Sequence, residues 1–338
     1  MGGILVRKAA IAWVCALALM VVTACSGKPW AAGSYPAKPI TVVAPSGAGG
    51  GWDLTARALV KALRESKLVN QSMSVENRPG GGGTVFLAEY ATQDRANPYK
   101  LFVNSPPILI NHLKKEGNSP FGYRDTTPLA QLTEDYGAYV VRADSPYRDL
   151  RSVLQVIQTH PERLTVAGGS APGSMDHLIA ILPVYYSGIS PKKMKYVSYD
   201  GGGEAMAALL GGNADLIATD ASSVGEYLRA GKVRVLAVTA PHRLSGELKA
   251  VPTLKELGIN TEFTIWRGVF GPKQMPPQSV KYWQKQLKAL SDHPVWKREL
   301  AANHWIGRYR DAQSFQAFLE EQDQQIRTLL KALGMAKP

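Results

Sequence analysis

Short apolar runs that suit β-strands alternate with segments of helical periodicity through most of this 338-residue chain. Ile40 to Ala44 is rich in β-branched residues, and Leu54, Ala58 and Leu59 then recur at helical spacing. Such alternation is typical of α/β folds with largely parallel sheets, because a crossover is needed between parallel strands. The other expected strands are Ser74 to Glu76, Leu101 to Val103, Tyr139 to Val141, Leu164 to Ala167, Tyr196 to Ser198, Leu216 to Ala218 and Val235 to Thr239.

The C-terminal stretch, Pro277 to Leu333, has helical spacing, and we expect it to be helical throughout. No long linker rich in proline or serine divides the sequence, so a domain boundary must fall where strands cross between domains. Tyr139 to Asp144 and Glu262 to Gly268 fit such crossings. Two domains are expected, because single hydrophobic cores rarely grow beyond about 250–300 residues.

The N-terminus has the features of an export signal. Arg7 and Lys8 precede an uncharged apolar stretch, Ala9 to Val22, which is short for a membrane span and typical of a signal-peptide core. The sequence Val-Thr-Ala-Cys that ends at Cys25 resembles a bacterial lipobox, which predicts lipidation of Cys25. The alternative is ordinary secretory cleavage near Ala31 and Ala32, with Cys25 removed.

Cysteine content and charge exclude several classes of protein. Cys15 and Cys25 are the only cysteines, so the mature chain has neither a disulfide nor a cysteine nucleophile. The formal net charge is +12, two of which are removed with the signal peptide, and such an excess suits an anionic partner or a generally basic exported protein. The basic residues are dispersed, without a block or an aromatic stripe, so nucleic acid is not an expected partner.

A glycine-rich junction, APSGAGGGWD, links the first expected strand to the first expected helix. Amides at the start of a helix lack internal partners, and the helix dipole is positive there. Glycines let a ligand approach these amides, so the junction predicts an anion site made of backbone; a tight turn without a ligand is the alternative. Asp53 could cap the helix. Trp52 could line an aromatic pocket or pack under the loop.

Phosphate is not the favoured anion for this junction. The Walker pattern requires a lysine that does not follow here, and the dinucleotide fingerprint requires a glycine where Trp52 stands. A carboxylate fits better, because a second junction of the same kind could bind a second carboxylate. This junction, VAGGSAPGSMDHL, contains Ser170, Gly173, Ser174 and His177. Ser170 and Ser174 add hydroxyl donors, and His177 is either a ligand contact or a buried structural histidine.

A third junction, LIATDASSVGEY, places Thr219, Asp220 and Ser222 after an expected strand. Aspartate is a favoured residue at helix starts, so we expect Asp220 to cap the following helix, with ligand contact as the alternative.

The chain resembles the receptors of tripartite tricarboxylate transporters, also called Bug receptors, in the order and spacing of six segments. They are YPAKPITVVAPSGAGGGWDLTARAL, VENRPGGGGT, GGSAPGSMDHL, YDGGGEAMAALLGGNAD, YLRAGKVRVLAVTAPHR and WRGVFGP. The resemblance covers nearly the whole mature chain, and the Gly-Gly-Gly-Trp-Asp form is more similar to the tricarboxylate-type branch. The chain departs from the pattern at Ser46-Gly47-Ala48 and at Pro172, which bears on the identity of the ligand.

The resemblance implies an α/β, two-lobed periplasmic binding protein (type II-like), each lobe a central, mainly parallel sheet flanked by helices and hinged by two strand crossings. The predicted parts are a signal peptide (1–24), a lipid-anchored linker (25–35), domain I (36–138 plus 266–338) and domain II (139–265). The protein is expected to be a periplasmic monomer, anchored through Cys25, that binds a small carboxylate and partners the membrane subunits of a transporter. The residues predicted to bind the ligand are Ser46, Gly49, Gly50, Gly51, Trp52, Asp53, Ser105, Ser170, Gly173, Ser174, His177, Thr219, Asp220 and Ser222.

A receptor that passes a ligand signal to a membrane kinase would have the same fold and site, so the sequence leaves this alternative open. Catalysis is not expected, because the six histidines show no zinc-binding spacing and no Gly-x-Ser-x-Gly segment is present. Asp176 and His177 are adjacent, and neighbours on a helix point to different faces. The sequence therefore predicts no catalytic residue, no metal and no cofactor.

Overall fold

The computed structural model describes residues 35–49, 51–116, 119–199 and 201–338. Lys38–Pro338 forms one compact unit, which is distinct from Met1–Ala37. The predicted signal peptide and Cys25 lie outside the described residues, so both stay predictions. Within the described ranges, no helix combines the length and apolarity that a membrane crossing requires.

The first part of the unit is built from parallel strands with intervening helices. β1 (Ile40–Ala44) pairs in parallel with β2 (Met73–Asn77) on one side and with β3 (Lys100–Asn104) on the other. α2 (Gly51–Glu65) follows β1, and its buried face includes Ala58, Leu59, Ala62 and Leu63, at the spacing of one helical stripe. Together with β9 (Thr264–Pro272) and β10 (Ile306–Asp311), these strands form what we call the β1 half.

The middle of the chain repeats this arrangement. β5 (Thr165–Gly168) pairs in parallel with β6 (Lys195–Ser198) and with β7 (Leu216–Asp220). Helix α6 (Met175–Tyr186) follows β5 and is almost wholly buried, which explains its continuous run of apolar residues. We call these strands, together with β8 (Val233–Val238), the β5 half.

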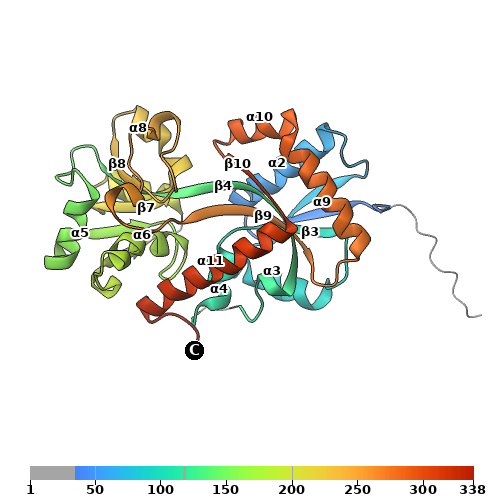
Figure 1. Cartoon of the computed structure of the whole chain (residues 1–338), viewed down its shortest axis with the longest axis horizontal. Coiled ribbons are helices and arrows are strands. Elements are labelled where there is room, and N and C mark those ends of the chain that lie inside the picture. The colour runs from blue at the N-terminus through green and yellow to red at the C-terminus, as the bar shows by residue number, and fades with distance from the viewer. Residues whose placement is uncertain (1–34, 50, 117–118, 200) are drawn as a thin grey trace, which may run out of the picture. The chain divides into compact units, whose positions relative to one another are not determined.

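One long strand, β4 (Thr126–Arg142), belongs to both halves (Figure 1). Its first part, residues 126–136, pairs antiparallel with β9 (Thr264–Pro272), and its last part pairs antiparallel with β7 and β8. β3 also pairs antiparallel with β9. The sheet is therefore mixed: the strand pairs next to the glycine junctions are parallel, whereas the crossing strands are antiparallel.

The C-terminal region differs from the helical stretch that the spacing predicts. α10 (Pro294–Ala302) ends before His304, which has a positive φ of 56°, and the chain then forms β10 (Ile306–Asp311), antiparallel to β4. The last helix, α11 (Ala312–Leu333), buries Phe315, Leu319, Ile326 and Leu329. It contacts α4 (Pro107–Leu113), which follows β3, and α6, which follows β5, and Figure 1 shows it running below β4 and β9.

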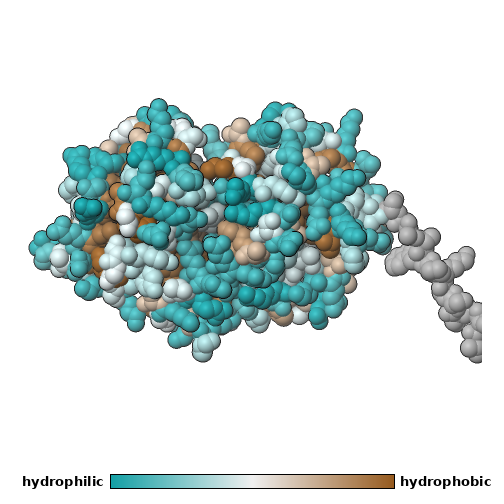
Figure 2. Space-filling model, viewed as in Figure 1, coloured by the Kyte–Doolittle hydropathy of each residue, from teal (hydrophilic) through white to brown (hydrophobic). Residues whose placement is uncertain are grey.

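The predicted α/β fold with two lobes joined by crossing strands is confirmed. The main core contains side chains from both halves, including Phe102, Tyr139, Trp266 and Phe315. Figure 2 shows a mainly hydrophilic face on which apolar residues are exposed in small, separate groups. The remaining helices are α3 (Thr84–Gln93), α4 (Pro107–Leu113), α5 (Leu150–Thr159), α7 (Gly202–Leu210), α8 (Gly225–Arg229) and α9 (Pro277–Asp292), with the 3₁₀ turn η6 (Ala221–Ser223) between β7 and α8.

Candidate ligand site at the strand ends

Asp53 organises the first glycine junction from inside. Its carboxylate accepts hydrogen bonds from the Gly49 amide at 2.8 Å, from the Asn77 side-chain amide at 2.9 Å and from Arg57 at 2.9 Å. Asp53 is only 2 % exposed. The hydrogen bond from Arg57 is the main reason that the pKa of Asp53 falls to about 2, against the opposing effect of burial. The Asp53 carboxylate is therefore ionised, and its hydrogen bonds are made to groups of the protein itself.

The same junction leaves backbone donors exposed. Gly49 has φ +80°, a conformation that favours glycine, and it is exposed together with Gly47 and Gly51. Within the described residues, the amides of Gly47, Gly51 and Trp52 donate to no other group. The Ser46 hydroxyl donates to the Gly47 carbonyl at 3.2 Å. Gly50 lies outside the described residues. The start of α2 thus presents unpaired N–H groups at the positive end of its dipole.

Trp52 and Ser105 belong to one contact. The Trp52 indole N–H donates to the Ser105 hydroxyl at 2.9 Å, and Ser105, just after β3, is 2 % exposed. A Cβ on Gly83 would lie 3.3 Å from the Trp52 ring. The half-buried indole therefore packs under the loop, between the end of β3 and the Gly80–Gly83 turn. This contact joins three segments of the β1 half.

In the second junction, some of the backbone amides donate to side chains of the junction itself. The Asp176 carboxylate accepts from the Gly169 amide at 2.7 Å, and the Ser170 hydroxyl accepts from the Asp176 amide at 2.9 Å. The Gly173 amide is buried and donates to Nδ1 of His177 at 2.8 Å. The Ser174 hydroxyl makes no bond to a described residue. Among the described residues, the half-buried Ser174 hydroxyl is therefore a free donor of this junction.

His177 has the environment of a structural histidine. It is 5 % exposed, stacks on Tyr196 with ring centroids 4.3 Å apart, and accepts the Gly173 hydrogen bond. Burial lowers its pKa to about 4, so the ring is neutral at pH 7, which suits its role as an acceptor. The contacts of His177 fix the shape of the loop.

The third junction pairs with a residue that the sequence reasoning missed. The Ser222 hydroxyl donates to the Asp135 carboxylate at 2.6 Å, and the Ser222 amide does so at 3.3 Å. The Thr219 and Ser223 hydroxyls lie 3.4 Å apart. The expected helix cap is wrong: the Asp220 carboxylate makes no capping bond, because the chain turns into a short 3₁₀ segment instead.

Arg267 on β9 is the second residue that was missed. Its neighbours in the strand, Trp266 and Gly268, face Phe315 of α11, so Arg267 projects from the opposite face of the sheet. A Cβ on Gly51 would lie 3.1 Å from the Arg267 guanidinium. The guanidinium is therefore beside the start of α2. It is the only charged side chain in the strand sequence TIWRGVFGP, a signal that could have identified it.

Three carboxylates share this region with Arg267. Burial raises the pKa of Asp135 to about 7 and that of Asp176 to about 7, and the negative charge of Asp220 adds to both shifts. Burial also raises the pKa of Asp220, and Arg267 opposes that increase. The charge of Arg267 therefore acts on Asp135 and Asp220, whereas Asp176 is affected by the charge of Asp220.

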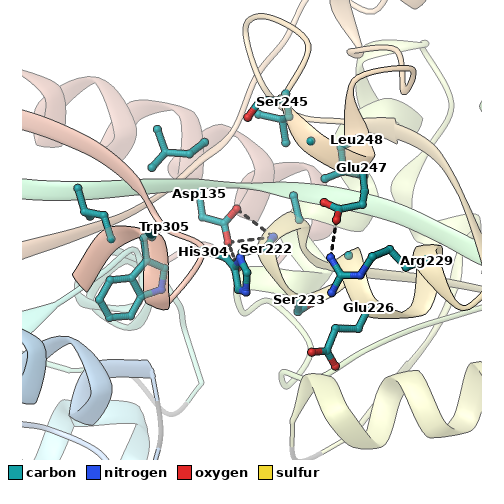
Figure 3. Close-up of a pocket in the computed structure, with 17 residues that line it drawn as sticks. Asp135, Ser222, Ser223, Glu226, Arg229, Ser245, Glu247, Leu248, His304 and Trp305 are labelled. Carbon is teal, nitrogen blue, oxygen red and sulfur yellow. Dashed lines mark hydrogen bonds and ion pairs between the residues drawn. The ribbon is translucent and has the colours of Figure 1, made fainter. Parts of the chain in front are cut away.

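Asp135 also lines a cavity of about 520 Å³ between the two halves (Figure 3). One wall comes from η6, α8 and residues 244–248, and it carries the Arg229–Glu247 ion pair. The opposite wall comes from α10 and β10 and includes His304 and Trp305. In the described parts of the chain, no group of three or more His, Cys, Asp or Glu side chains is arranged to bind a metal ion.

Comparison with known proteins identifies the family. The family pattern described as "Tripartite tricarboxylate transporter family receptor" matches residues 55–335. A Cupriavidus necator relative, the UPF0065 protein in the gbd 5′ region, is 30% identical over 309 residues, which cover 90% of each chain. A TctC solute-binding protein from Polaromonas has 27% identity and a TM-score of 0.73, over 88% of this chain and 99% of that one.

Two further solved structures share the fold. MatC from Rhodopseudomonas palustris with bound malate is 23% identical with a TM-score of 0.71, over 88% of this chain and 100% of that one. An R. palustris protein with adipate is 24% identical with a TM-score of 0.74, over 89% of this chain and 99% of that one. The chain therefore belongs to the tripartite tricarboxylate transporter receptor family, whose members are solute-binding receptors of the periplasmic binding protein type.

Proposed function

We propose that this receptor captures a small carboxylated anion between its two halves and delivers it to a tripartite tricarboxylate-type membrane permease. The observation that carries the proposal is the unpaired N-terminal turn of α2 with the Arg267 guanidinium beside it. Backbone N–H groups and a guanidinium are both donors that suit a carboxylate.

The second junction provides a place for the other end of the anion. Ser170 and Ser174 are half-buried near the start of α6, and the helix dipole is positive there. A ligand with two separated carboxylates would contact one junction in each half. Malate and adipate, the ligands in the two R. palustris structures, are both dicarboxylates, which supports this class of ligand.

We propose that the halves correspond to domain I (36–138 plus 266–338) and domain II (139–265), which close around the ligand by bending at the crossing strands. Gly137 lies where β4 passes from one half to the other, and its amide donates to the Thr239 hydroxyl, which donates in turn to the Phe263 carbonyl. These bonds tie the two crossing segments together. A ligand that contacts both halves stabilises the closed state.

The proposal includes export and membrane attachment. The predicted signal peptide and the lipidation of Cys25 would place the receptor in the periplasm as a membrane-anchored monomer. Metabolic labelling with a palmitate analogue tests the anchor: label is expected on the wild type and absent from Cys25→Ser. Equal labelling of both proteins would remove the anchor from the proposal.

A panel of carboxylates tests the binding function. Mono-, di- and tricarboxylates and their neutral amides are titrated into the purified protein by calorimetry and melting shift. At least one di- or tricarboxylate is expected to bind, and its amide is not. Binding of the neutral analogues alone would overturn the proposal. So would the absence of binding for every compound in the panel.

Two glycine variants test the first junction. Gly51→Val places a branched side chain against the Arg267 guanidinium and over the α2 amides, so it is expected to abolish binding. Gly203→Val is the matched control, since it also lies in a first helical turn and a Cβ there meets nothing within 4 Å. Equal affinities of the two variants would remove the α2 start from the site. A co-purification with the permease subunits distinguishes transport from a sensory role.

A further inference from the structure

Asp220 and Arg267 carry opposite charges and have no partner within the described residues. No described residue donates a hydrogen bond to the Asp220 carboxylate, and the Ser223 hydroxyl donates to the Asp220 backbone carbonyl instead. Among the residues that the structure describes, the Arg267 guanidinium forms neither a hydrogen bond nor an ion pair, although Arg267 is half-buried. A polar group withdrawn from water without a partner is costly, so two such groups in one region require a reason.

Strand register places these residues in one row. Arg267 lies opposite Thr133 on β4, and Asp220 lies opposite Gly137. Thr133, Asp135 and Gly137 alternate onto the same side of β4, and directly opposite residues share that side. Four residues of β-strand span roughly 13 Å. The row therefore crosses from the β1 half to the β5 half with Asp135 at its centre.

The two charges influence each other across a gap. Arg267 opposes the rise in the pKa of Asp220, yet no ion pair joins them. The two acids near Asp220 have hydrogen-bond donors: Asp135 of the row accepts from Ser222 and from the Tyr136 amide, and Asp176 of α6 accepts from the Gly169 amide. Asp220 is thus the one carboxylate of this group left without a donor in the described part of the chain.

We propose that Asp220 and Arg267 determine the specificity of the ligand site. Arg267 and the α2 amides bind a carboxylate of the ligand, and Asp220 accepts a hydrogen bond from a hydroxyl or ammonium group on the same molecule. This assignment rests on the proposed function, because it gives roles within that site. The preferred ligand is then a hydroxy- or amino-substituted carboxylate. An unsubstituted acid leaves Asp220 buried against it without a donor.

Ligands with one carbon skeleton test the role of Asp220. Succinate, malate and aspartate are compared by calorimetry, as are glutarate, 2-hydroxyglutarate and glutamate, and tricarballylate and citrate. In the wild type, the substituted acid of at least one set is expected to bind on the order of 10–100-fold more tightly than the unsubstituted acid, as for hydrogen bonds to charged groups. The hydroxy and amino members of each set show which donor the site takes.

Asp220→Asn is expected to reduce the preference for the substituted acid to a few-fold. Arg267→Gln is expected to weaken the binding of all carboxylates, while the preference for the substituted acid persists. Asp292→Asn and Arg163→Gln are the controls, because both residues are exposed and are not placed in the site. A wild type that prefers the unsubstituted acid, or an unchanged preference in Asp220→Asn, would overturn the assignment while the proposed function stands. Silence toward every carboxylate would overturn both.

The ligand-free protein gives an independent test. If Asp220 accepts a hydrogen bond only from a bound ligand, Asp220→Asn removes a charge that raises the pKa of Asp135 and of Asp176 in the ligand-free protein. The Tm of the ligand-free variant is therefore expected to rise at pH 8, while ligand affinity falls. Opposite effects on stability and binding are the signature of a binding residue. A lower Tm for Asp220→Asn would show a structural role and contradict the assignment.

Discussion

The sulfur of Met335 lies 2.9 Å from the position that a Cβ on Gly173 would occupy. Gly173 belongs to the second glycine junction, and Met335 follows α11. The tail beyond α11 is also fixed to the β1 half, because the Lys337 amide donates to the Leu113 carbonyl at 2.8 Å and the Lys115 amide to the Met335 carbonyl at 2.9 Å. The tail therefore packs against the second junction, which we propose as part of the ligand site.

Gly173→Ala is expected to lower the free energy of unfolding by about 2–3 kcal/mol. Gly173 has φ +72°, which is unfavourable for alanine by about 1 kcal/mol, and crowding against Met335 adds the rest. Denaturant unfolding of Gly173→Ala, Met335→Ala and the double variant measures the coupling. The double variant should recover part of the loss, and strict additivity would contradict the contact.

Asp53→Asn is expected to remove an acid-sensitive part of the stability. The pKa of Asp53 is depressed to about 2 in the folded state, below the unfolded value near 3.9. The ionised carboxylate thus stabilises the fold above about pH 4, and this contribution, about 2 kcal/mol, is lost as the pH falls toward 2. Unfolding free energies between pH 2 and 6 measure it. Arg57→Gln should shrink the same pH dependence, because it removes the main cause of the shift.

Asp176→Asn is expected to have the opposite pH signature. The folded-state pKa of Asp176 is raised to about 7, so the folded form retains a proton that the unfolded form releases near pH 4. The contribution of Asp176 to the free energy of unfolding is therefore fully present below pH 4. It declines by on the order of 2–4 kcal/mol as the pH rises to 7. The variant should be more stable than the wild type at pH 8, with little difference at pH 4. Parallel curves for the two proteins would contradict this account.

Gly268→Ala is expected to cost on the order of 1–3 kcal/mol, because a Cβ there would overlap the Phe315 ring of α11. Phe315→Leu should reduce that cost when the two changes are combined, although it is destabilising alone. Thermal unfolding of the four proteins tests the packing of α11 on β9. A harmless Gly268→Ala would show that the helix does not sit against this strand.

Periodicity predicts the regular elements well, because burial of one face is written into the sequence. The expected helix Leu150 to Gln158 is Leu150–Thr159 in the structure, and Asp176 to Tyr186 is Met175–Tyr186. β10 could not be predicted from the sequence IGRYRD, because its strand conformation depends on pairing with β4, which is distant in the chain. Local pattern gives no access to such a partner.

The site was only partly predictable for the same reason. The first glycine junction is a local feature, so its exposed amides could be inferred from the strand, the glycines and the helix that follow one another. Asp135 gave no signal, because its role depends on Ser222, 87 residues away. Asp220 carried a cap signal that the tertiary structure does not use. The relation between Asp220 and Arg267 depends on how β7 and β9 pair with β4, so it could not be inferred from the sequence.

β4 is a single strand of 17 residues, and it joins the two halves of the sheet through one continuous backbone. The proposed rotation of one half against the other would twist the backbone of β4 near Glu134 to Gly137, where its pairing changes from β9 to β7. Asp135 lies in that stretch, whereas its hydrogen-bond donor Ser222 lies in η6, which follows β7 of the β5 half. If the halves close as proposed, the Asp135–Ser222 hydrogen bond must therefore change its geometry during the rotation.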